Sequence, residues 1–337
     1  SMDYFFDYTS QITNQFIDPK KRVFLFYILI SILIATAWFM INKKLSFKKT
    51  LIKIFDKKIF FSKSAKSDYK IFLINQFIML LVSPFLITQL TIATALYFYF
   101  HSIDWLSPGM FVEVAKFYII SFFTIFQFTL DDLSKYIVHR FMHKWPILWA
   151  LHKVHHSATT LTPMTVFRTH PLEGIIFSIR SAITQAIGIS LFFYLFGNAV
   201  DLYTILGVNI FVFLFNIFGS NLRHSHIGIR YWRWLEYVLI SPAQHQLHHS
   251  IAKAHHDKNF GATLALWDWL FGSLHHSIEY DTLELGIEKN QTEESHYLKN
   301  LYLNPFFEIK DYFLKKFKNF KFKISQLVMK GEYFNEN

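Results

Sequence analysis

The chain contains 337 residues, of which 52% are hydrophobic, 19% aromatic and only 17% charged. Because soluble domains usually carry about a quarter charged residues, this composition excludes a disordered or fibrous chain and favours an integral membrane protein. Cysteine is absent, which excludes disulfides, cysteine-ligated zinc, iron–sulfur clusters and thiolate-ligated haem. Histidine occurs 17 times, so we expect any metal chemistry to depend on imidazole.

Apolar segments long enough to cross a bilayer, about 20 residues each, occur at five places. They are Val23–Ile41, Ile71–Phe100, Phe111–Leu130, Gly174–Phe196 and Leu202–Gly219. The second is longer than necessary and contains Pro84, which predicts a kinked span or a span with a buried turn. A short turn joins the last two, so we predict a transmembrane hairpin over residues 174–219. The first 22 residues lack the apolar stretch of a cleavable signal.

Lysines concentrate between the first two predicted spans. Asn42–Lys70 contains ten lysines against Asp56 and Asp68. Such a loop is either a solvated linker or, as we prefer, a cytoplasmic loop that contacts anionic lipid headgroups. Five crossings then place the N-terminus outside and the C-terminus inside, although the basic run Lys20–Arg22 would lie on the outer side.

Three histidine clusters follow the predicted spans. They are His139 and His143 (H-x-x-x-H), then His152, His155 and His156 (H-x-x-H-H), and finally His245, His248 and His249 (H-x-x-H-H). On a helix, residues three and four positions apart share a face, so each cluster predicts imidazoles that point the same way. Neutral imidazole binds iron, copper, nickel and zinc, but one helix cannot surround an ion. The predicted hairpin would return the third cluster to the side of the first two, where three helices could enclose two ions.

We therefore predict nine metal ligands in this chain. They are His139, His143, His152, His155, His156, His224, His245, His248 and His249. His170 and His226 are predicted either as ligands or as hydrogen-bond donors that orient a ligand. The remaining six divide into four that we expect to be solvated or to support a ligand (His255, His256, His275 and His276) and two that take no part (His101 and His296).

The histidine motifs resemble the histidine boxes of the fatty acid hydroxylase/sterol desaturase superfamily. Asp257–Gly261 (D-K-N-F-G) and Trp267–Gly272 (W-D-W-L-F-G) are similar to the C-terminal signature of that family, and the resemblance covers about residues 131–272. It implies a membrane oxidase in which a histidine-bound di-iron centre uses O₂ to hydroxylate or desaturate lipid C–H bonds. An external electron donor is implied, because no flavin, haem or NAD motif is visible. Zinc could replace iron on purification, since divalent-metal affinity favours zinc over Fe²⁺.

Two positions bear on the branch of the superfamily. The ether-cleaving branch carries Glu directly after the second histidine of the first box, whereas this chain has Lys144. Arg168–Glu173 (R-T-H-P-L-E) is similar to the His-Pro run of the sterol-type branches. We therefore favour a sterol-desaturase-like lipid oxidase, while a fatty acyl hydroxylase and a glyceryl-ether monooxygenase stay open. Lys144 could also be an interfacial cation that reaches lipid headgroups.

Two other classes of protein stay open from the sequence. One is a membrane metal-binding or transport protein, although transport sites usually lie near the bilayer midplane on broken helices. The other is a membrane zinc hydrolase, although such enzymes usually place a carboxylate within the motif, as in H-E-x-x-H. Iron-dependent consumption of O₂ would separate the oxidase from both.

The sequence predicts an all-α, polytopic membrane helix bundle with a cytoplasmic helical metal-binding cap. Residues 1–130 would form the N-terminal spans and basic loop, 131–275 the histidine-box oxidase core, and 276–337 a C-terminal tail. Within the tail, Lys310–Lys323 interleaves Phe with Lys, which is typical of a helix in the membrane interface. The expected partners are a membrane lipid substrate, an electron donor and anionic headgroups, and not nucleic acid.

Overall fold

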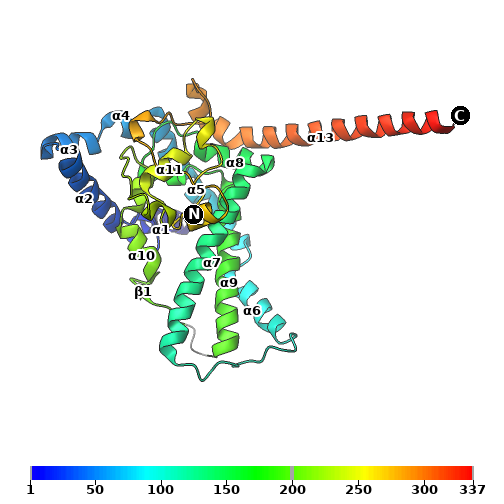
Figure 1. The fold of residues 1–337 in the computed structure, drawn as a ribbon, viewed down its shortest axis with the longest axis horizontal. Coiled ribbons are helices and arrows are strands. Elements are labelled where there is room, and N and C mark those ends of the chain that lie inside the picture. Colours follow the sequence, from blue (N-terminus) through cyan, green and yellow to red (C-terminus); the bar gives the residue numbers. More distant parts are fainter. Residues whose placement is uncertain (1, 198–200, 336–337) are drawn as a thin grey trace.

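The structure is a computed structural model that describes residues 2–197 and 201–335. Helices dominate this part of the chain and form a stalk and a cap (Figure 1). In chain order, the elements are α1 (Met2–Ile17), α2 (Leu25–Asn42), α3 (Phe47–Ile54), α4 (Lys57–Phe60), α5 (Lys63–Val82), α6 (Gln89–Phe100), α7 (Lys116–Lys144), α8 (Pro146–His156), α9 (Pro171–Phe196), β1 (Thr204–Ile205), β2 (Val208–Asn209), α10 (Ile210–Ile217), α11 (Pro242–His248), α12 (Leu266–Leu270) and α13 (Leu298–Asn335). The two strands form only one short antiparallel hairpin in the described chain. Because helices make up most of the described residues, the prediction of an all-α fold is confirmed.

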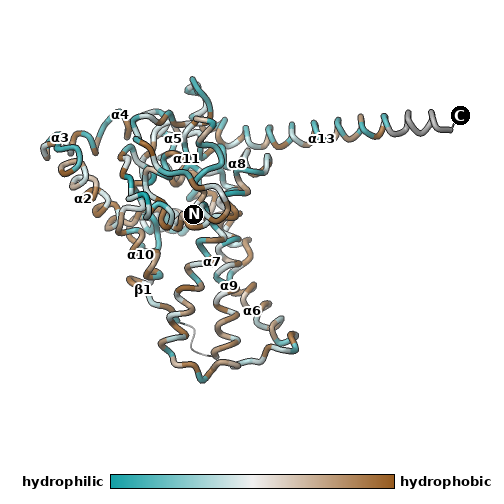
Figure 2. The backbone as a smooth tube through the Cα atoms, in the orientation of Figure 1, coloured by the Kyte–Doolittle hydropathy of each residue, from teal (hydrophilic) through white to brown (hydrophobic). Residues whose placement is uncertain are grey.

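The stalk consists of α7 and α9, which run side by side, with α6 packed against α9 (Figure 1). Figure 2 shows that hydrophobic residues predominate along the stalk, whereas the cap is mixed. Phe117, Tyr118 and Phe122 of α7 are exposed. Because large contiguous apolar surfaces are rare on proteins that face only water, the stalk surface is suited to contact with lipid.

Within residues 2–197 and 201–335, three helical stretches are long and apolar enough to cross a membrane. They are α2, Lys63–Phe100 (which contains α5 and α6) and α9, and they correspond to the first, second and fourth predicted spans. A 3₁₀ turn around Pro84 separates α5 from α6, so the long second span is interrupted near this proline. The third predicted span, 111–130, lies largely within α7, which continues beyond it into the cap.

The prediction of a fifth span over residues 202–219 is wrong. This segment contains the β1–β2 hairpin and the eight-residue helix α10. Leu206 and Gly207 have positive φ angles of 51° and 74°, as the two-residue turn between the strands requires. Eight helical residues rise only about 12 Å, much less than the ~30 Å hydrocarbon core. The sidedness that we inferred from five crossings therefore loses the support of that count and stays a prediction.

A buried ion pair joins the cap to α5. Arg168 Nη1 lies 3.0 Å from Asp68 Oδ1, and neither side chain is exposed. Arg168 Nε donates to the carbonyl oxygen of Val154 at 3.0 Å, near the end of α8. Thr165 Oγ1 donates to the second carboxylate oxygen of Asp68 at 2.8 Å. These contacts fix the end of α8, which carries the second histidine cluster, against α5.

The C-terminal helix α13 begins on the cap and then extends away from it (Figure 1). Near its start, Leu301 is buried against Ile71 of α5 and Val154 of α8. Farther along, Phe313 and Phe317 are exposed. The interfacial role of this tail and the three domain boundaries drawn from the sequence stay predictions.

Candidate metal centre

All nine histidines that were predicted as ligands converge in the cap, where they form two groups. The five-histidine group consists of His139 and His143 from α7, His152 and His156 from α8, and His248 from α11. The four-histidine group consists of His155 from α8, His224 from the segment after α10, and His245 and His249 from α11 and its C-cap. In each group, one ring nitrogen from every member lies within 4.8 Å of all the others. Because α8 and α11 contribute to both groups, the groups are neighbours.

Ring nitrogens within each group face one another at short distances. In the five-histidine group, His139 Nε2 lies 3.1 Å from Nε2 of both His152 and His248. In the four-histidine group, His224 Nε2 lies 3.2 Å from His155 Nε2 and 2.9 Å from His245 Nε2. Two imidazole lone pairs repel at such distances unless a proton or a cation lies between them. The arrangement therefore suits a bound cation in each group.

Hydrogen bonds set the orientation of three rings in the five-histidine group. His139 Nδ1 lies 2.7 Å from the carbonyl oxygen of Phe260, and His248 Nδ1 lies 2.6 Å from that of Lys258. His152 Nδ1 lies 2.8 Å from Glu173 Oε1, and both side chains are buried. Carbonyl and carboxylate oxygens can only accept, so each Nδ1 carries the proton and donates it. The lone pair of each ring is then on Nε2, which faces the group, as a metal ligand requires.

The C-terminal signature of the sequence positions two of these acceptors. Asp268 accepts hydrogen bonds from the backbone N–H of Phe260 at 2.8 Å and of Gly261 at 2.7 Å. Burial raises the pKa of Asp268 to about 6, although these hydrogen bonds act in the opposite direction. Asp132 on α7 accepts from the indole N–H of Trp267 at 3.0 Å and from two backbone N–H groups. Two aspartates thus fold the loop whose carbonyl oxygens orient His139 and His248.

Several ring nitrogens of the centre are buried and have no hydrogen-bond partner in the described part of the chain. They include His143 Nε2, His156 Nε2 and both nitrogens of His249. Burial, followed by the neighbouring imidazoles, holds the pKa of His143 and His156 well below the usual 6.5, and burial lowers the pKa of His248 to about 3. These rings are therefore neutral at pH 7 and have free lone pairs. Because a buried polar atom without a partner is costly, the residues present fit a pair of metal ions.

The other histidines lie outside both groups. His170 Nε2 contacts the carbonyl oxygen of Tyr302 at 3.2 Å, and His226 Nε2 contacts that of Lys53 at 2.7 Å. His296 Nδ1 lies 3.0 Å from Arg168 Nη2. The remaining five, which also lie outside the groups, are His101, His255, His256, His275 and His276.

Sequence reasoning missed two charged residues at the centre. Glu173 holds His152, and a signal for it existed, because it is a carboxylate in the first turn of an otherwise apolar helix. Arg22 precedes α2, and its Nη2 atom lies 3.3 Å from Nδ1 of His224. No sequence signal could have found Arg22, since 202 positions separate it from its partner.

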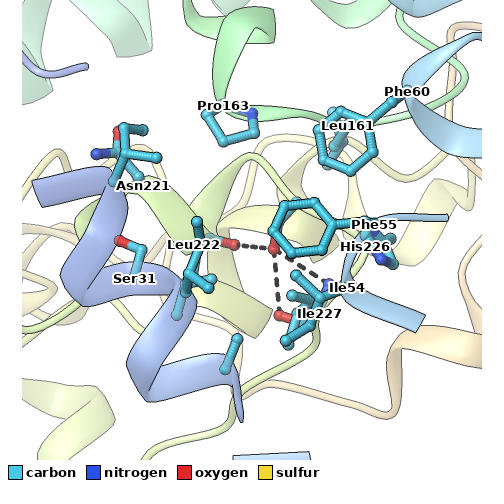
Figure 3. A pocket seen from close by; sticks show the side chains of 14 residues that line it. Ser31, Ile54, Phe55, Phe60, Leu161, Pro163, Asn221, Leu222, His226 and Ile227 are labelled. Carbon is cyan, nitrogen blue, oxygen red and sulfur yellow. Dashed lines mark hydrogen bonds between the residues drawn. The ribbon is translucent and has the colours of Figure 1, made fainter. Parts of the chain in front are cut away.

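One cavity adjoins the centre, and a second lies beside segments that carry candidate ligands. A cleft of about 380 Å³ borders the five-histidine group and is lined by His143, His156, His248 and Asp257 among others. At its rim, Lys144 pairs with Asp257 at 2.5 Å, so this lysine has a partner within the protein. A second cavity of about 120 Å³ has almost wholly apolar walls and lies between α2, the α3–α4 region and residues 221–227 (Figure 3).

The fold and the site together define a class of protein: a helical protein with helices long and apolar enough to cross a membrane and two neighbouring groups of histidines that suit bound metal. The family model described as "Fatty acid hydroxylase" matches residues 124–273, which include all nine histidines. The resemblance inferred from the histidine motifs is thereby confirmed over this region.

Three relatives show what the chain is similar to. The ornithine lipid hydroxylase OlsE of Rhizobium tropici is 27% identical over 50% of this chain and 46% of its own length. A Delta(7)-sterol 5(6)-desaturase of Gibberella zeae is 30% identical over 37% of this chain and 34% of its own length. The alkylglycerol monooxygenase of Danio rerio is 28% identical over 42% of this chain and 28% of its own length. The chain thus spans less than half the length of these relatives, whose names all denote oxidoreductases. No solved structure matches.

Proposed function

We propose that the protein is an integral-membrane, O₂-dependent, non-haem di-iron lipid oxidase that hydroxylates or desaturates a C–H bond. The observation that carries this proposal is the pair of histidine groups in which one ring nitrogen of every member lies within 4.8 Å of the others, together with the buried ring nitrogens that have no hydrogen-bond partner among the described residues. One iron would be held by the five-histidine group and the other by the four-histidine group. When bound, iron would supply the redox chemistry with O₂ that zinc cannot provide.

The residues around the histidines would have three tasks in this reaction. Glu173 and the carbonyl oxygens of Lys258 and Phe260 hold their rings in the ligating orientation. Seven of the nine histidines are buried, which limits the access of bulk water to the reacting centre. The open cleft beside His143 and Asp257 gives an external electron donor its nearest approach to the five-histidine group.

The apolar cavity supports a lipid substrate. Two of its walls belong to segments that also carry candidate ligands: Leu222 and Ser225 flank His224, and Leu161 follows the last histidine of α8 by five positions. Figure 3 shows Leu222 and Ile227 on one side of the cavity and Leu161 on another. A hydrocarbon chain placed there would lie against Leu222 and Ser225, which flank His224 in the chain, and against α2, which is long and apolar enough to cross a membrane.

Within the oxidase class, we propose a sterol-desaturase-like reaction rather than ether cleavage. The support is Lys144, which stands where the ether-cleaving branch carries Glu and which pairs with Asp257 in this chain. Incubation of the iron-loaded protein with an alkylglycerol and a tetrahydropterin under O₂ tests this choice. We expect no release of fatty aldehyde, and pterin-dependent release would assign the protein to the ether-cleaving branch.

Lipid mass spectrometry of a host with and without the protein tests the proposed function itself. We expect a lipid that has gained one oxygen atom or lost two hydrogen atoms. The product should disappear in the His143→Ala variant and persist in His101→Ala, because His101 is exposed and lies outside both groups. An unchanged lipid profile, or loss of the product in both variants, would contradict the assignment.

A further inference from the structure

The two histidine groups have charges of opposite sign beside them. Next to the five-histidine group, the buried carboxylate of Glu173 accepts a hydrogen bond from His152. Asp257 lies at the edge of the same group, but Lys144 already pairs with it. Glu173 is therefore the carboxylate that attracts a cation to this group and keeps the His152 ring ready to bind it.

Two guanidinium groups lie beside the four-histidine group. Arg22 Nη2 lies 3.3 Å from His224 Nδ1 and 3.2 Å from the carbonyl oxygen of Ser220. Arg223, next to His224 in the chain, is also buried, and its guanidinium donates to the carbonyl oxygens of Ser220 and Ala262. Within the described residues, arginine forms ion pairs at Arg168, Arg180 and Arg230, so neither of these two cations has a carboxylate partner. A divalent cation in this group would be repelled by both.

The hydrogen bond from Arg22 also decides which nitrogen of His224 carries the proton. A guanidinium can only donate, so His224 Nδ1 accepts and the proton lies on Nε2. That Nε2 faces His155 Nε2 at 3.2 Å and His245 Nε2 at 2.9 Å, where a metal would have to bind. Metal binding at this Nε2 therefore requires its proton to leave, either to Nδ1 with loss of the hydrogen bond from Arg22 or to solvent, whereas His152 already presents a free Nε2 lone pair.

We propose that the two groups bind metal with unequal affinity and in a fixed order. The five-histidine group binds first and tightly with the help of Glu173, and the four-histidine group binds second and weakly because of Arg22. This inference rests on the metal centre of the proposed function but not on its reaction. One unit charge at the distance of a neighbouring side chain changes the affinity for a divalent ion by about tenfold or more. When metal is limiting, the chain should hold one ion.

Titration of the metal-free, full-length protein in detergent with Co²⁺ tests the order of binding. Visible absorption reports the coordination of Co²⁺, and equilibrium dialysis counts the bound ions. We expect two steps of one Co²⁺ per chain, with dissociation constants that differ by about tenfold or more. The His143→Ala variant should lose the tight step, and the His245→Ala variant should lose the weak one.

Variants of Arg22 and Glu173 test whether the charges of these two residues cause the difference in metal affinity. Arg22→Gln should strengthen the weak step about tenfold, whereas Arg22→Lys, which keeps the charge, should not. Glu173→Gln should weaken only the tight step. Two equal steps, loss of the tight step in His245→Ala, or an unchanged weak step in folded Arg22→Gln would overturn the inference. If Arg22→Gln does not fold, the two ligand variants still decide the order.

The outcomes also separate this inference from the proposed function. Two unequal steps in a chain that oxidises no lipid would support the binding order and contradict the oxidase. Two equal steps in a chain that oxidises lipid would overturn the binding order alone. A chain that binds no Co²⁺ would overturn both.

Discussion

Asp68 and Arg168 form an ion pair across 100 positions of sequence, with no exposed surface on either side chain. Removal of one charge would leave the other buried without compensation, which typically costs about 3–5 kcal/mol. We therefore expect Asp68→Asn to lower the free energy of unfolding by that amount. Thermal unfolding followed by circular dichroism measures the loss. The matched control is Glu293→Gln, which breaks the exposed pair with Lys63 and should cost at most about 1 kcal/mol.

A substitution at Gly261 tests whether the loop that contains it orients His139 and His248. A Cβ atom at this position would lie 2.5 Å from the carbonyl oxygen of Leu264 and 2.8 Å from Asp268 Oδ2. We expect Gly261→Ala to destabilise the protein by about 1–3 kcal/mol, as overpacking usually does, and to weaken metal binding. Thermal unfolding and Co²⁺ titration check the two effects. Gly174→Ala is the control, since its added Cβ meets nothing within 4 Å, and equal behaviour of the two variants would refute this role of the loop.

The sequence predicted which histidines lie together at the candidate centre, but it did not predict how they divide into two groups. Histidines at i, i+3 and i+4 were expected to share one face of a helix, and all nine residues do lie together. Adjacent residues on a helix, however, point about 100° apart, because one turn contains 3.6 residues. His155 therefore points into the four-histidine group, whereas His156 points into the other. Which partners each ring meets depends on contacts between segments far apart in the chain.

The wrong prediction of a fifth membrane span has a different physical cause. Apolar composition reports that residues avoid water, but not whether they meet lipid or other protein. In 202–219, a turn at Leu206 and Gly207 breaks the segment, and Phe213 and Phe215 of α10 are buried inside the protein. The first, second and fourth predicted spans coincide with helical stretches that are long and apolar enough to cross a membrane, although a turn at Pro84 interrupts the second.

The environment of His296 leads us to expect that the free energy of unfolding of the protein depends on pH. Burial, with the cation of Arg168, lowers the pKa of His296 to about 4, and the ring accepts a hydrogen bond from Arg168. An unfolded chain takes up this proton near pH 6.5, so the folded state loses stability as pH falls from about 6.5 to about 4. The His296→Gln variant cannot take up this proton. We expect its melting temperature to fall less than that of the wild type over this range, and parallel curves would contradict this account.

Membrane sidedness can be measured directly, because the chain has no cysteine. Ser46, Ser107 and Lys289 are exposed. Ser46 directly precedes α3 and Lys289 lies between α12 and α13, whose first turns belong to the cap, whereas the segment from α6 to α7, which contains Ser107, runs at the far end of the stalk (Figure 1). We expect Ser46→Cys and Lys289→Cys to react with an impermeant maleimide only after the cells are opened. Ser107→Cys should react in intact cells. The reverse pattern would place the metal centre outside, and labelling of all three in intact cells would refute a membrane barrier between them.

His139 and His248 donate to carbonyl oxygens only two residues apart, at Phe260 and Lys258, although one ring comes from α7 and the other from α11. A single loop therefore orients the rings of two candidate ligands that lie on different helices. Any shift of this loop moves both rings together, so substitutions at the two histidines and in the loop should interact rather than add in their effects. Such epistasis means that this part of the chain can change in evolution only through coordinated steps, with the loop and both histidines inherited as one unit.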